Sequence, residues 1–212
     1  GLVHELRRAP TGPLRDLVVE AMTTNETSFF RDRTPFDVLR DHVLPGLIAA
    51  RATTRRLRIW CGASSSGQEP YSIAMVLLDR FPELRGWDVR IVGTDVSAEM
   101  VARARDGVYS QMEVGRGMPT PMLVRFFEQQ GTRWKVRPEV RDLVAFAEFN
   151  LIGTWPPPVP TPDVVFLRNV MIYFDATAKQ SILRNVERIL APDGALFLGA
   201  GESVVNSGTS LV

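Results

Sequence analysis

Two acidic residues, Glu69 and Asp95, are the strongest indication of chemistry in this chain. Glu69 follows a loop of small residues at 62–67, which joins a strand-like run at 57–61 to an apolar helical run at 73–78. A strand, a glycine-bearing turn and a helix form the nucleotide-binding corner of an α/β sheet. A carboxylate there would repel a phosphate but would suit a cationic amine. An ordinary turn with a surface glutamate is the alternative, because a glycine-rich turn alone is a weak signal.

Asp95 ends the alternating segment 88–95, and it follows Gly67 by 28 residues. In nucleoside-binding α/β folds, a carboxylate at the tip of the second strand accepts hydrogen bonds from ribose hydroxyls. Ser97 is expected to cap the next helix, and capping by Asp95 itself is the structural alternative. Glu69 and Asp95 together suggest a ligand with a ribose and a positive amino group but no phosphate. S-adenosylmethionine fits this description, whereas NAD fits badly because the turn lacks an uninterrupted Gly-x-Gly-x-x-Gly.

Further polar residues interrupt apolar segments or follow expected strands. Ligands of open α/β sheets bind outside the carboxyl ends of the strands, so several of these residues are expected to share a crevice with Glu69 and Asp95. The residues are Asn25, Thr27, Arg31, Asn150, Arg168 and Asn169. For Asn25, Thr27 and Arg31 the alternative is helix capping with a surface arginine.

Composition places the chain among globular proteins. Its 212 residues are 45% hydrophobic, which permits one well-buried α/β domain with a small appendage. No apolar run approaches 18 residues, so no membrane span is expected. The 25 basic residues are balanced by 24 acidic ones, which argues against nucleic-acid binding. The single cysteine, Cys61, is expected to be a small core residue and is compatible with a reducing cytoplasm. We expect no metal site.

Hydrophobic periodicity predicts alternating helices and strands. Helices are expected at 14–22 and at 36–48, the second ended or bent near Pro45 and Gly46. Because helices are expected between most of the strands, the strands should form a largely parallel sheet that is covered on both faces. The strands are expected at 57–61, 89–94, 143–149, 163–167 and 195–199.

The region 106–142 departs from this rhythm. It contains a short helical piece at about 122–129 and a pair of extended pieces at 134–137 and 143–146. The region is too small to be a domain. It is either an antiparallel flap used for partner contact or a long decorated loop.

Five ordered motifs extend the argument beyond single residues, and together they span most of the chain from Leu14 to about Val204. The motifs are Thr-Thr-Asn-Glu-Thr-Ser-Phe-Phe-Arg at 23–31, Gly-Gln-Glu-Pro-Tyr-Ser at 67–72, Gly-Thr-Asp at 93–95, Arg-Asn-Val-Met-Ile-Tyr-Phe at 168–174 and Leu-Ala-Pro-Asp-Gly at 190–194. With these motifs the chain resembles the CheR family, the chemotaxis-receptor glutamate O-methyltransferases.

The resemblance implies an α/β, Rossmann-like methyltransferase fold. It implies a mostly parallel seven-stranded sheet, a small inserted β-subdomain at about 106–142 and a residual N-terminal helix. Residues 1–34 are then the remnant of an N-terminal helical region with its linker, and residues 35–212 are the methyltransferase domain. The chain departs from the usual family pattern in the glycine-rich turn, where Ser64 replaces a cysteine and Gln68 replaces an acid.

The resemblance also implies S-adenosylmethionine as cofactor, with S-adenosylhomocysteine as the product. Arg31 and Tyr173 are expected beside the transferred methyl group as the catalytic residues. For Tyr173 a core aromatic at helical spacing is the alternative. The implied cofactor-binding residues are Asn25, Thr27, Arg31, Glu69, Asp95, Asn150, Leu151, Arg168 and Asn169.

The implied activity is methylation of glutamate side chains on chemotaxis receptors in the cytoplasm, which gives methyl esters and tunes adaptation. The implied partners are the receptors' cytoplasmic methylation helices. The insertion looks a few residues short between Gly131 and Val136, and this resembles family members that do without a C-terminal pentapeptide tether. The alternative from another class is a non-catalytic module that binds S-adenosylmethionine or docks a partner.

Overall fold

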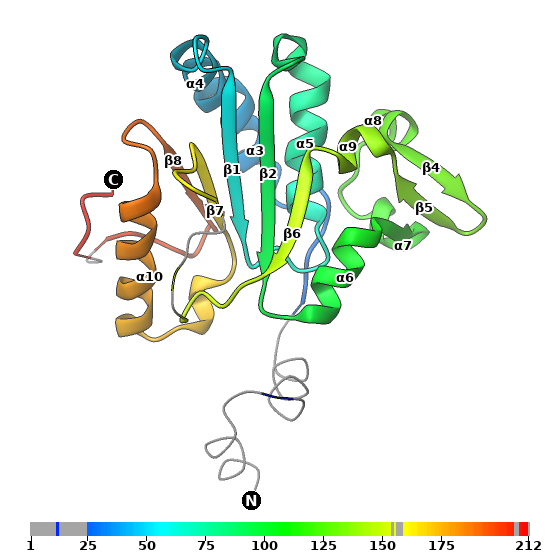
Figure 1. Cartoon of the computed structure of the whole chain (residues 1–212). Helices are drawn as coiled ribbons and strands as arrows, with labels where there is room; N and C mark the ends of the chain where they lie inside the picture. The colour runs from blue at the N-terminus through cyan, green and yellow to red at the C-terminus, as the bar shows by residue number, and fades with distance from the viewer. Residues whose placement is uncertain (1–11, 13–24, 154, 156–158, 206–207, 212) are drawn as a thin grey trace, which may run out of the picture.

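A parallel five-stranded sheet forms the centre of the computed structural model, which describes residues 12, 25–153, 155, 159–205 and 208–211 (Figure 1). All four strand pairings in this sheet are parallel, and the order is β6-β2-β1-β7-β8. The strands are β1 (Arg56–Gly62), β2 (Asp88–Asp95), β6 (Val144–Glu148), β7 (Val164–Leu167) and β8 (Ala195–Leu198).

The sequence pattern located each of these strands to within one residue at either end. The count of seven strands, which came from the family resemblance, is not reached in the described part of the chain. The described residues after Leu198 form turns and irregular backbone instead of further strand. Gly199 and Gly201 open that segment, and glycine is a poor strand former.

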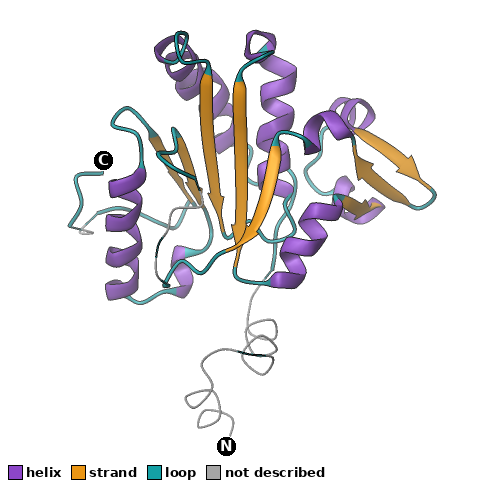
Figure 2. Cartoon of the chain, in the orientation of Figure 1, coloured by secondary structure: helices purple, strands orange, loops and turns teal. Residues whose placement is uncertain are grey.

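Alternate residues of the central strands enter two separate cores, because successive strand side chains point to opposite faces. Val164 and Phe166 of β7 pack in one core with helix α5 (Gln68–Arg80). Val165 and Leu167 pack in the other core with helix α10 (Ala176–Ile189). Both faces of the sheet are therefore covered, as the near-continuous apolar strands predict (Figure 2).

The helix expected at 36–48 is present but not uniform. It consists of α3 (Thr34–Val38), a π-helical turn η1 (Leu39–Val43) and α4 (Leu44–Ala50). Proline lacks an amide hydrogen and crowds the preceding turn, and Pro45 lies two residues after the widened turn. The irregularity expected near Pro45 and Gly46 is therefore a π-helical turn just before them, and the helix continues to Ala50. The helix expected at 14–22 lies outside the described residues.

A small antiparallel subdomain follows α6 (Ala98–Asp106) and lies beside the main sheet in Figure 1. Its sheet has the strand order β3-β5-β4. Its elements are β3 (Val108–Ser110), α7 (Gln111–Gly115), α8 (Thr120–Phe126), β4 (Phe127–Gln130), β5 (Arg133–Val136) and α9 (Pro138–Arg141). Two short 3-10 turns, η2 (Pro82–Leu84) and η3 (Met171–Tyr173), complete the described elements.

One local prediction for this subdomain was wrong. The helix expected at 122–129 ends at Phe126, and the next four residues form β4, because Phe127 is buried against Phe29 and Tyr109. The pieces expected to be extended at 134–137 and 143–146 do contain strands, but in different sheets. The first contributes to β5, which pairs with β3 and β4, whereas the second belongs to β6 of the main sheet.

No helix in the described part of the chain is long and apolar enough to cross a membrane. The division into a remnant at 1–34 and a methyltransferase domain at 35–212 stays a prediction.

The subdomain packs directly on the segment that carries the first polar motif. The ring of Phe29 meets the rings of Tyr109 and Phe127 edge-on, at centroid distances of 4.9 and 5.4 Å. Gly117, in the loop between α7 and α8, passes so close to this segment that a Cβ atom would lie 2.2 Å from the carbonyl oxygen of Phe29. Only glycine fits there, and its φ of +90° also lies in the region that favours glycine.

We therefore expect Gly117→Ala to destabilise the protein. An L residue at positive φ costs about 1–2 kcal/mol, and the clash with Phe29 adds to that cost. At about 2–4 °C for each kcal/mol, the melting temperature should fall by at least about 4 °C. Gly115→Ala is the control, since nothing lies within 4 Å of its added Cβ. Equal melting temperatures for the two variants would contradict the close packing of Gly117.

Candidate functional site

A cavity of about 270 Å³ opens at the carboxyl ends of β1, β2 and β7. Residues from four separate segments line it, so the site exists only in the folded chain. Seven of the nine predicted cofactor-binding residues and the predicted catalytic Tyr173 are among them. The lining residues are Asn25, Glu26, Thr27, Ser28, Arg31, Ala63, Ser64, Ser65, Glu69, Asp95, Val96, Arg168, Asn169, Val170, Ile172, Tyr173 and Phe174.

Asp95 fixes the glycine-rich turn to the end of β2. Its carboxylate accepts hydrogen bonds from the backbone N–H of Ser65 at 2.7 Å and of Ser97 at 3.0 Å. Ser97 is the N-cap of α6, because its hydroxyl accepts from the N–H of Met100. The capping role therefore belongs to Ser97, and the buried Asp95 orders the turn that borders the cavity.

The serines of the glycine-rich turn do not cap α5. The N-cap is Gly67, with a φ of 92° and no side-chain cap. The Ser65 hydroxyl instead donates to the carbonyl oxygen of Asn25, which ties the turn to the first motif. The Ser66 hydroxyl donates to the side-chain oxygen of Gln68.

Left-handed backbone conformations gather around the cavity at residues that are not glycine. Ala63 and Ser65 have φ values of 57° and 47°, and Asn169 has a φ of 59°. Phe30 and Asp32, next to Arg31, have φ values of 50° and 64°. Such conformations cost about 1–3 kcal/mol each and persist where the surrounding structure enforces them. Their concentration here marks the cavity as a functional site.

A buried arginine joins three segments beneath the cavity. The guanidinium of Arg168 donates to the Glu69 carboxylate at 2.8 Å and to the Asp32 carboxylate at 2.7 Å. It also donates to the carbonyl oxygen of Arg31 at 3.1 Å. The Arg168 side chain is 2% exposed, and that of Glu69 is 14% exposed. Asp32 was missed by the sequence analysis, although its position directly after Arg31 was a usable signal.

Burial raises the pKa of the Glu69 carboxyl above its ordinary value of 4.5, and the nearby Arg168 guanidinium opposes this shift. The carboxyl therefore lies in an environment that rewards an additional positive charge. A cationic group bound in the cavity would stabilise the ionised form of Glu69. This is the electrostatic condition that an amine-bearing ligand requires.

Arg31 and Tyr173 border the cavity from opposite ends of the sequence. The Arg31 guanidinium donates to the carbonyl oxygen of Glu26 at 2.8 Å, which fixes the arginine beside the cavity. Tyr173 ends the turn η3 and is 58% exposed. It is therefore not the core aromatic of the alternative interpretation.

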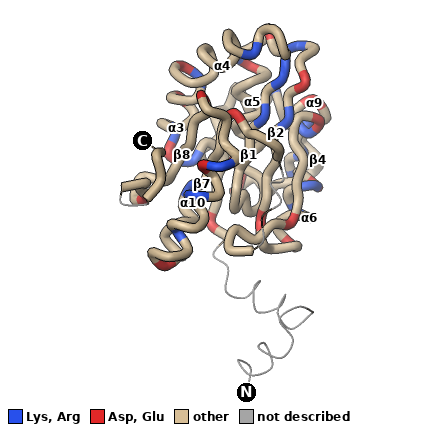
Figure 3. Tube along the Cα trace, turned by 60° about the vertical axis from the view of Figure 1, so that its left-hand side comes forward, with Lys and Arg blue, Asp and Glu red and all other residues tan. Residues whose placement is uncertain are grey.

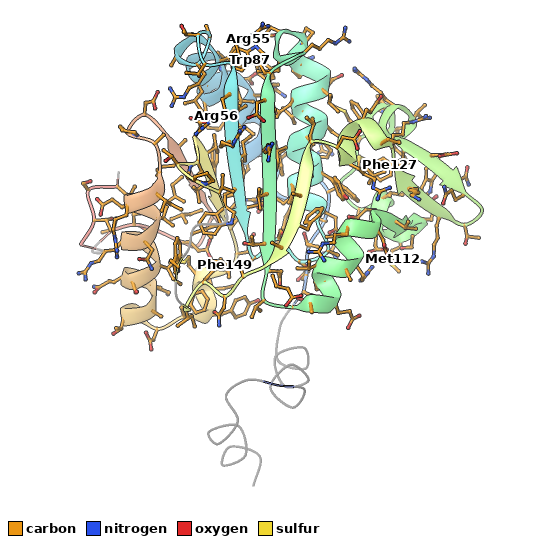
Figure 4. The ribbon with its side chains drawn as sticks, in the orientation of Figure 1. Arg55, Arg56, Trp87, Met112, Phe127 and Phe149 are labelled. Carbon is orange, nitrogen blue, oxygen red and sulfur yellow. The ribbon has the colours of Figure 1, made fainter. Side chains whose placement is uncertain are left out.

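Asn150 and Leu151 do not line the cavity. The Asn150 side chain accepts from the N–H of Ile152, and Leu151 is buried in the second core. The aromatic rings of Phe149, Trp60 and Trp155 pack edge-on beside them, with centroid distances of 5.4–5.9 Å. Figure 4 shows Phe149 at the end of the sheet opposite to Arg55 and Arg56. Asn150 and Leu151 thus lie in the segment after β6, where Asn150 forms a local turn and Leu151 packs in the core.

Glu202 is the second residue that the sequence analysis missed. Its carboxylate accepts hydrogen bonds from the backbone N–H groups of Asn169, Met171, Ile172 and Gly199. No spacing rule could have linked a glutamate to a segment 30 residues earlier in the chain. The contact is decided by the neighbouring positions of β7 and β8.

Two buried polar atoms at the cavity have no partner within the described part of the chain, the Ser64 hydroxyl oxygen and the Arg168 Nε. Buried polar groups are normally hydrogen-bonded, so these two atoms are exceptions beside the cavity. No group of three or more His, Cys, Asp or Glu side chains that could hold a metal ion occurs among the described residues. Basic and acidic residues are interspersed along the chain in Figure 3.

Comparison with known proteins decides the family. Residues 25–211 match the family described as CheR methyltransferase, SAM binding domain. The chain belongs to the CheR family. It is 46% identical over 200 residues to chemotaxis protein methyltransferase 1 of Pseudomonas aeruginosa, with 92% of this chain and 72% of that protein covered.

Two further CheR relatives agree. The chain is 42% identical to chemotaxis protein methyltransferase Cher2 of Pseudomonas putida, a match that covers 96% of this chain and 74% of that protein. It is 38% identical to the chemotaxis protein methyltransferase of Escherichia coli, covering 87% of this chain and 63% of that protein. The α/β methyltransferase fold, the cofactor S-adenosylmethionine and the enzyme class expected from the sequence are confirmed.

The raised pKa of Glu69 predicts a pH-dependent stability. The folded chain holds a proton on Glu69 more tightly than the unfolded chain does. Its contribution to the free energy of unfolding is therefore complete below about pH 4.5 and is lost as the pH rises through the raised pKa. We expect the free energy of unfolding of the parent, minus that of Glu69→Gln, to fall as the pH rises above 4.5.

Urea unfolding of the parent and of Glu69→Gln, from pH 4.5 upward, measures the difference in their free energies of unfolding. Glu128→Gln is the control, because it changes an exposed carboxyl on β4. A parent-minus-variant difference for Glu69→Gln that stays constant with pH, or that rises, would contradict the assignment.

Proposed function

We propose that this chain transfers methyl groups from S-adenosylmethionine to glutamate side chains of chemotaxis receptors. The observation that carries the proposal is the single cavity that unites Glu69 and Asp95 with Arg31 and Tyr173. The first pair suits a nucleoside that carries an amine, and the second pair suits a carboxylate beside it. The CheR relatives supply the reaction and the receptor class.

The cavity residues divide by chemistry into two proposed roles. Glu69 accepts from the amino group of the cofactor, and Asp95 accepts from the ribose hydroxyls, since a carboxylate oxygen can accept more than one hydrogen bond. Asn25, Thr27 and Asn169 add neutral hydrogen-bonding groups, and Arg168 holds Glu69 in place. Asn150 and Leu151 stay proposed only as a boundary of the pocket, because neither lines the cavity.

The proposed reaction asks the protein for alignment more than for proton transfer. When bound, S-adenosylmethionine would supply a methyl group on a sulfonium: the methyl carbon would bond to the substrate carboxylate oxygen as its bond to sulfur breaks, leaving S-adenosylhomocysteine. A glutamate with a pKa of about 4.3 is already ionised at neutral pH, so no general base is required. Arg31 positions the carboxylate of the substrate, and Tyr173 orients one of its oxygens toward the methyl group.

The receptor is recognised directly through its methylation helix in the cytoplasm, without a pentapeptide tether. β4 forms one of the two edges of the small sheet, the edge beside the short turn at Gly131. That edge is only four residues long, and alternate residues direct their backbone groups to β5. Two outward-facing residues offer little for a peptide added as a further strand.

We expect Arg31→Ala and Tyr173→Phe to lower kcat for receptor methylation by about tenfold or more. Cofactor affinity should change by less than about threefold, because both side chains act at the reacting centre. Transfer of tritiated methyl to receptor fragments, released by alkali as expected of an ester, measures kcat, and calorimetry with S-adenosylhomocysteine measures affinity. Arg33→Ala is the control, because this exposed neighbour does not line the cavity.

Equal losses of affinity and activity in both variants would contradict these roles. Cofactor binding by the parent chain, without methylation of any receptor fragment, would favour the non-catalytic module.

We also expect no micromolar binding of receptor C-terminal pentapeptides. The short edge of β4 provides too few outward-facing backbone groups for a stable added strand. Titration of a labelled chain with such a peptide, followed by NMR, checks this. Saturable shifts confined to Phe127–Gln130 and their neighbours on β5 would restore the tethered mode.

A further inference from the structure

The segment 168–174 carries Asn169 and Tyr173 to the cavity, yet regular structure holds little of it. β7 ends at Leu167, Asn169 has a φ of 59°, and η3 is only three residues long. A short segment with a left-handed residue needs an external constraint to keep one conformation. The described contacts identify that constraint.

Glu202 contacts this segment through both oxygens of its carboxylate. One oxygen accepts from the N–H of Asn169 at 2.9 Å and of Gly199 at 2.6 Å. The other accepts from the N–H of Met171 at 2.7 Å and of Ile172 at 3.3 Å. Four backbone donors thus converge on one carboxylate, and hydrogen bonds to an ionised acceptor are stronger than neutral ones.

The backbone around Glu202 is shaped for this contact. The N–H of Glu202 donates to the carbonyl oxygen of Gly199 at 2.9 Å, which closes a turn directly after β8. A Cβ atom at Gly199 would lie 2.8 Å from the Glu202 carboxylate and 2.9 Å from the side-chain nitrogen of Asn169. Glycine at this position therefore allows the carboxylate to reach the segment.

We propose that Glu202 is a positioning residue for methyl transfer, because it holds the segment 168–174 in the conformation that presents Tyr173. The expected effect on methyl transfer rests on the proposed function, whereas the claim that Glu202 holds the backbone of segment 168–174 does not. Glu202 does not touch the reacting atoms. It acts through the backbone of Asn169, Met171 and Ile172.

The test begins with Glu202→Gln, which replaces one acceptor oxygen by a donor group. We expect kcat for receptor methylation to fall by about tenfold or more. In a Tyr173→Phe background the same substitution should cost less than about threefold, because both changes then affect one function. A merely structural role would give equal losses in the two backgrounds, which would overturn the proposal.

A matched control carboxylate contacts the same C-terminal segment from helix α10. The Glu187 carboxylate accepts from the N–H and the hydroxyl of Ser210, at 2.6 and 2.5 Å, and not from residues 168–174 in the described part of the chain. Glu187→Gln should therefore leave kcat unchanged. A loss of kcat equal to that of Glu202→Gln would overturn the proposal, because loosening of the segment alone would then explain both.

An NMR measurement separates this proposal from the proposed function. In Glu202→Gln the amide proton signals of Asn169, Met171 and Gly199 should move upfield, since each loses a charged acceptor. Unchanged signals would overturn the proposal whatever the activity. Upfield movement of these signals in a chain that methylates no receptor would support the contact while refuting the proposed function. If Glu202→Gln does not fold, Glu202→Asp replaces it: the shorter side chain keeps both acceptor oxygens but draws them back, so the same signals should again move upfield.

Discussion

The buried ion-pair network of Arg168 is the interaction on which the site depends. Its guanidinium contacts Glu69 on α5, Asp32 in the N-terminal segment and the carbonyl oxygen of Arg31. Removing one partner from a buried pair leaves a charge without compensation, which costs several kcal/mol. The network therefore fixes the relative positions of the end of β7, the start of α5 and the motif around Arg31.

Carboxylates that accept hydrogen bonds from backbone N–H groups also fix the segments around the cavity. Asp95 holds the glycine-rich turn through the N–H of Ser65, and Glu202 holds the segment that carries Tyr173. Asp95 is the last residue of β2 and Glu202 follows β8, and beyond strand ends backbone donors lack ladder partners. Anionic acceptors can thus stabilise left-handed backbone at Ser65 and Asn169 that would otherwise be unfavourable.

The inserted subdomain contributes to the site although it supplies none of its lining residues. The Tyr109 hydroxyl donates to the carbonyl oxygen of Ser66 in the glycine-rich turn at 2.6 Å. Arg116 forms an ion pair with Glu26, whose carbonyl oxygen accepts from Arg31. That pair is largely exposed and so contributes little by itself. The buried contacts of Tyr109 are the stronger link between the subdomain and the cavity.

The sequence by itself determined the parallel strands, the helix cap at Ser97 and the types of residue that line the cavity. Apolar strand runs and helix caps depend on neighbours in the chain, so the local sequence reveals them. Only the tertiary structure decided that Leu151 packs in the core, that Phe127 starts a strand and that Glu202 reaches Asn169. These outcomes depend on which distant segments become neighbours, and strand order across a sheet is not encoded by local periodicity.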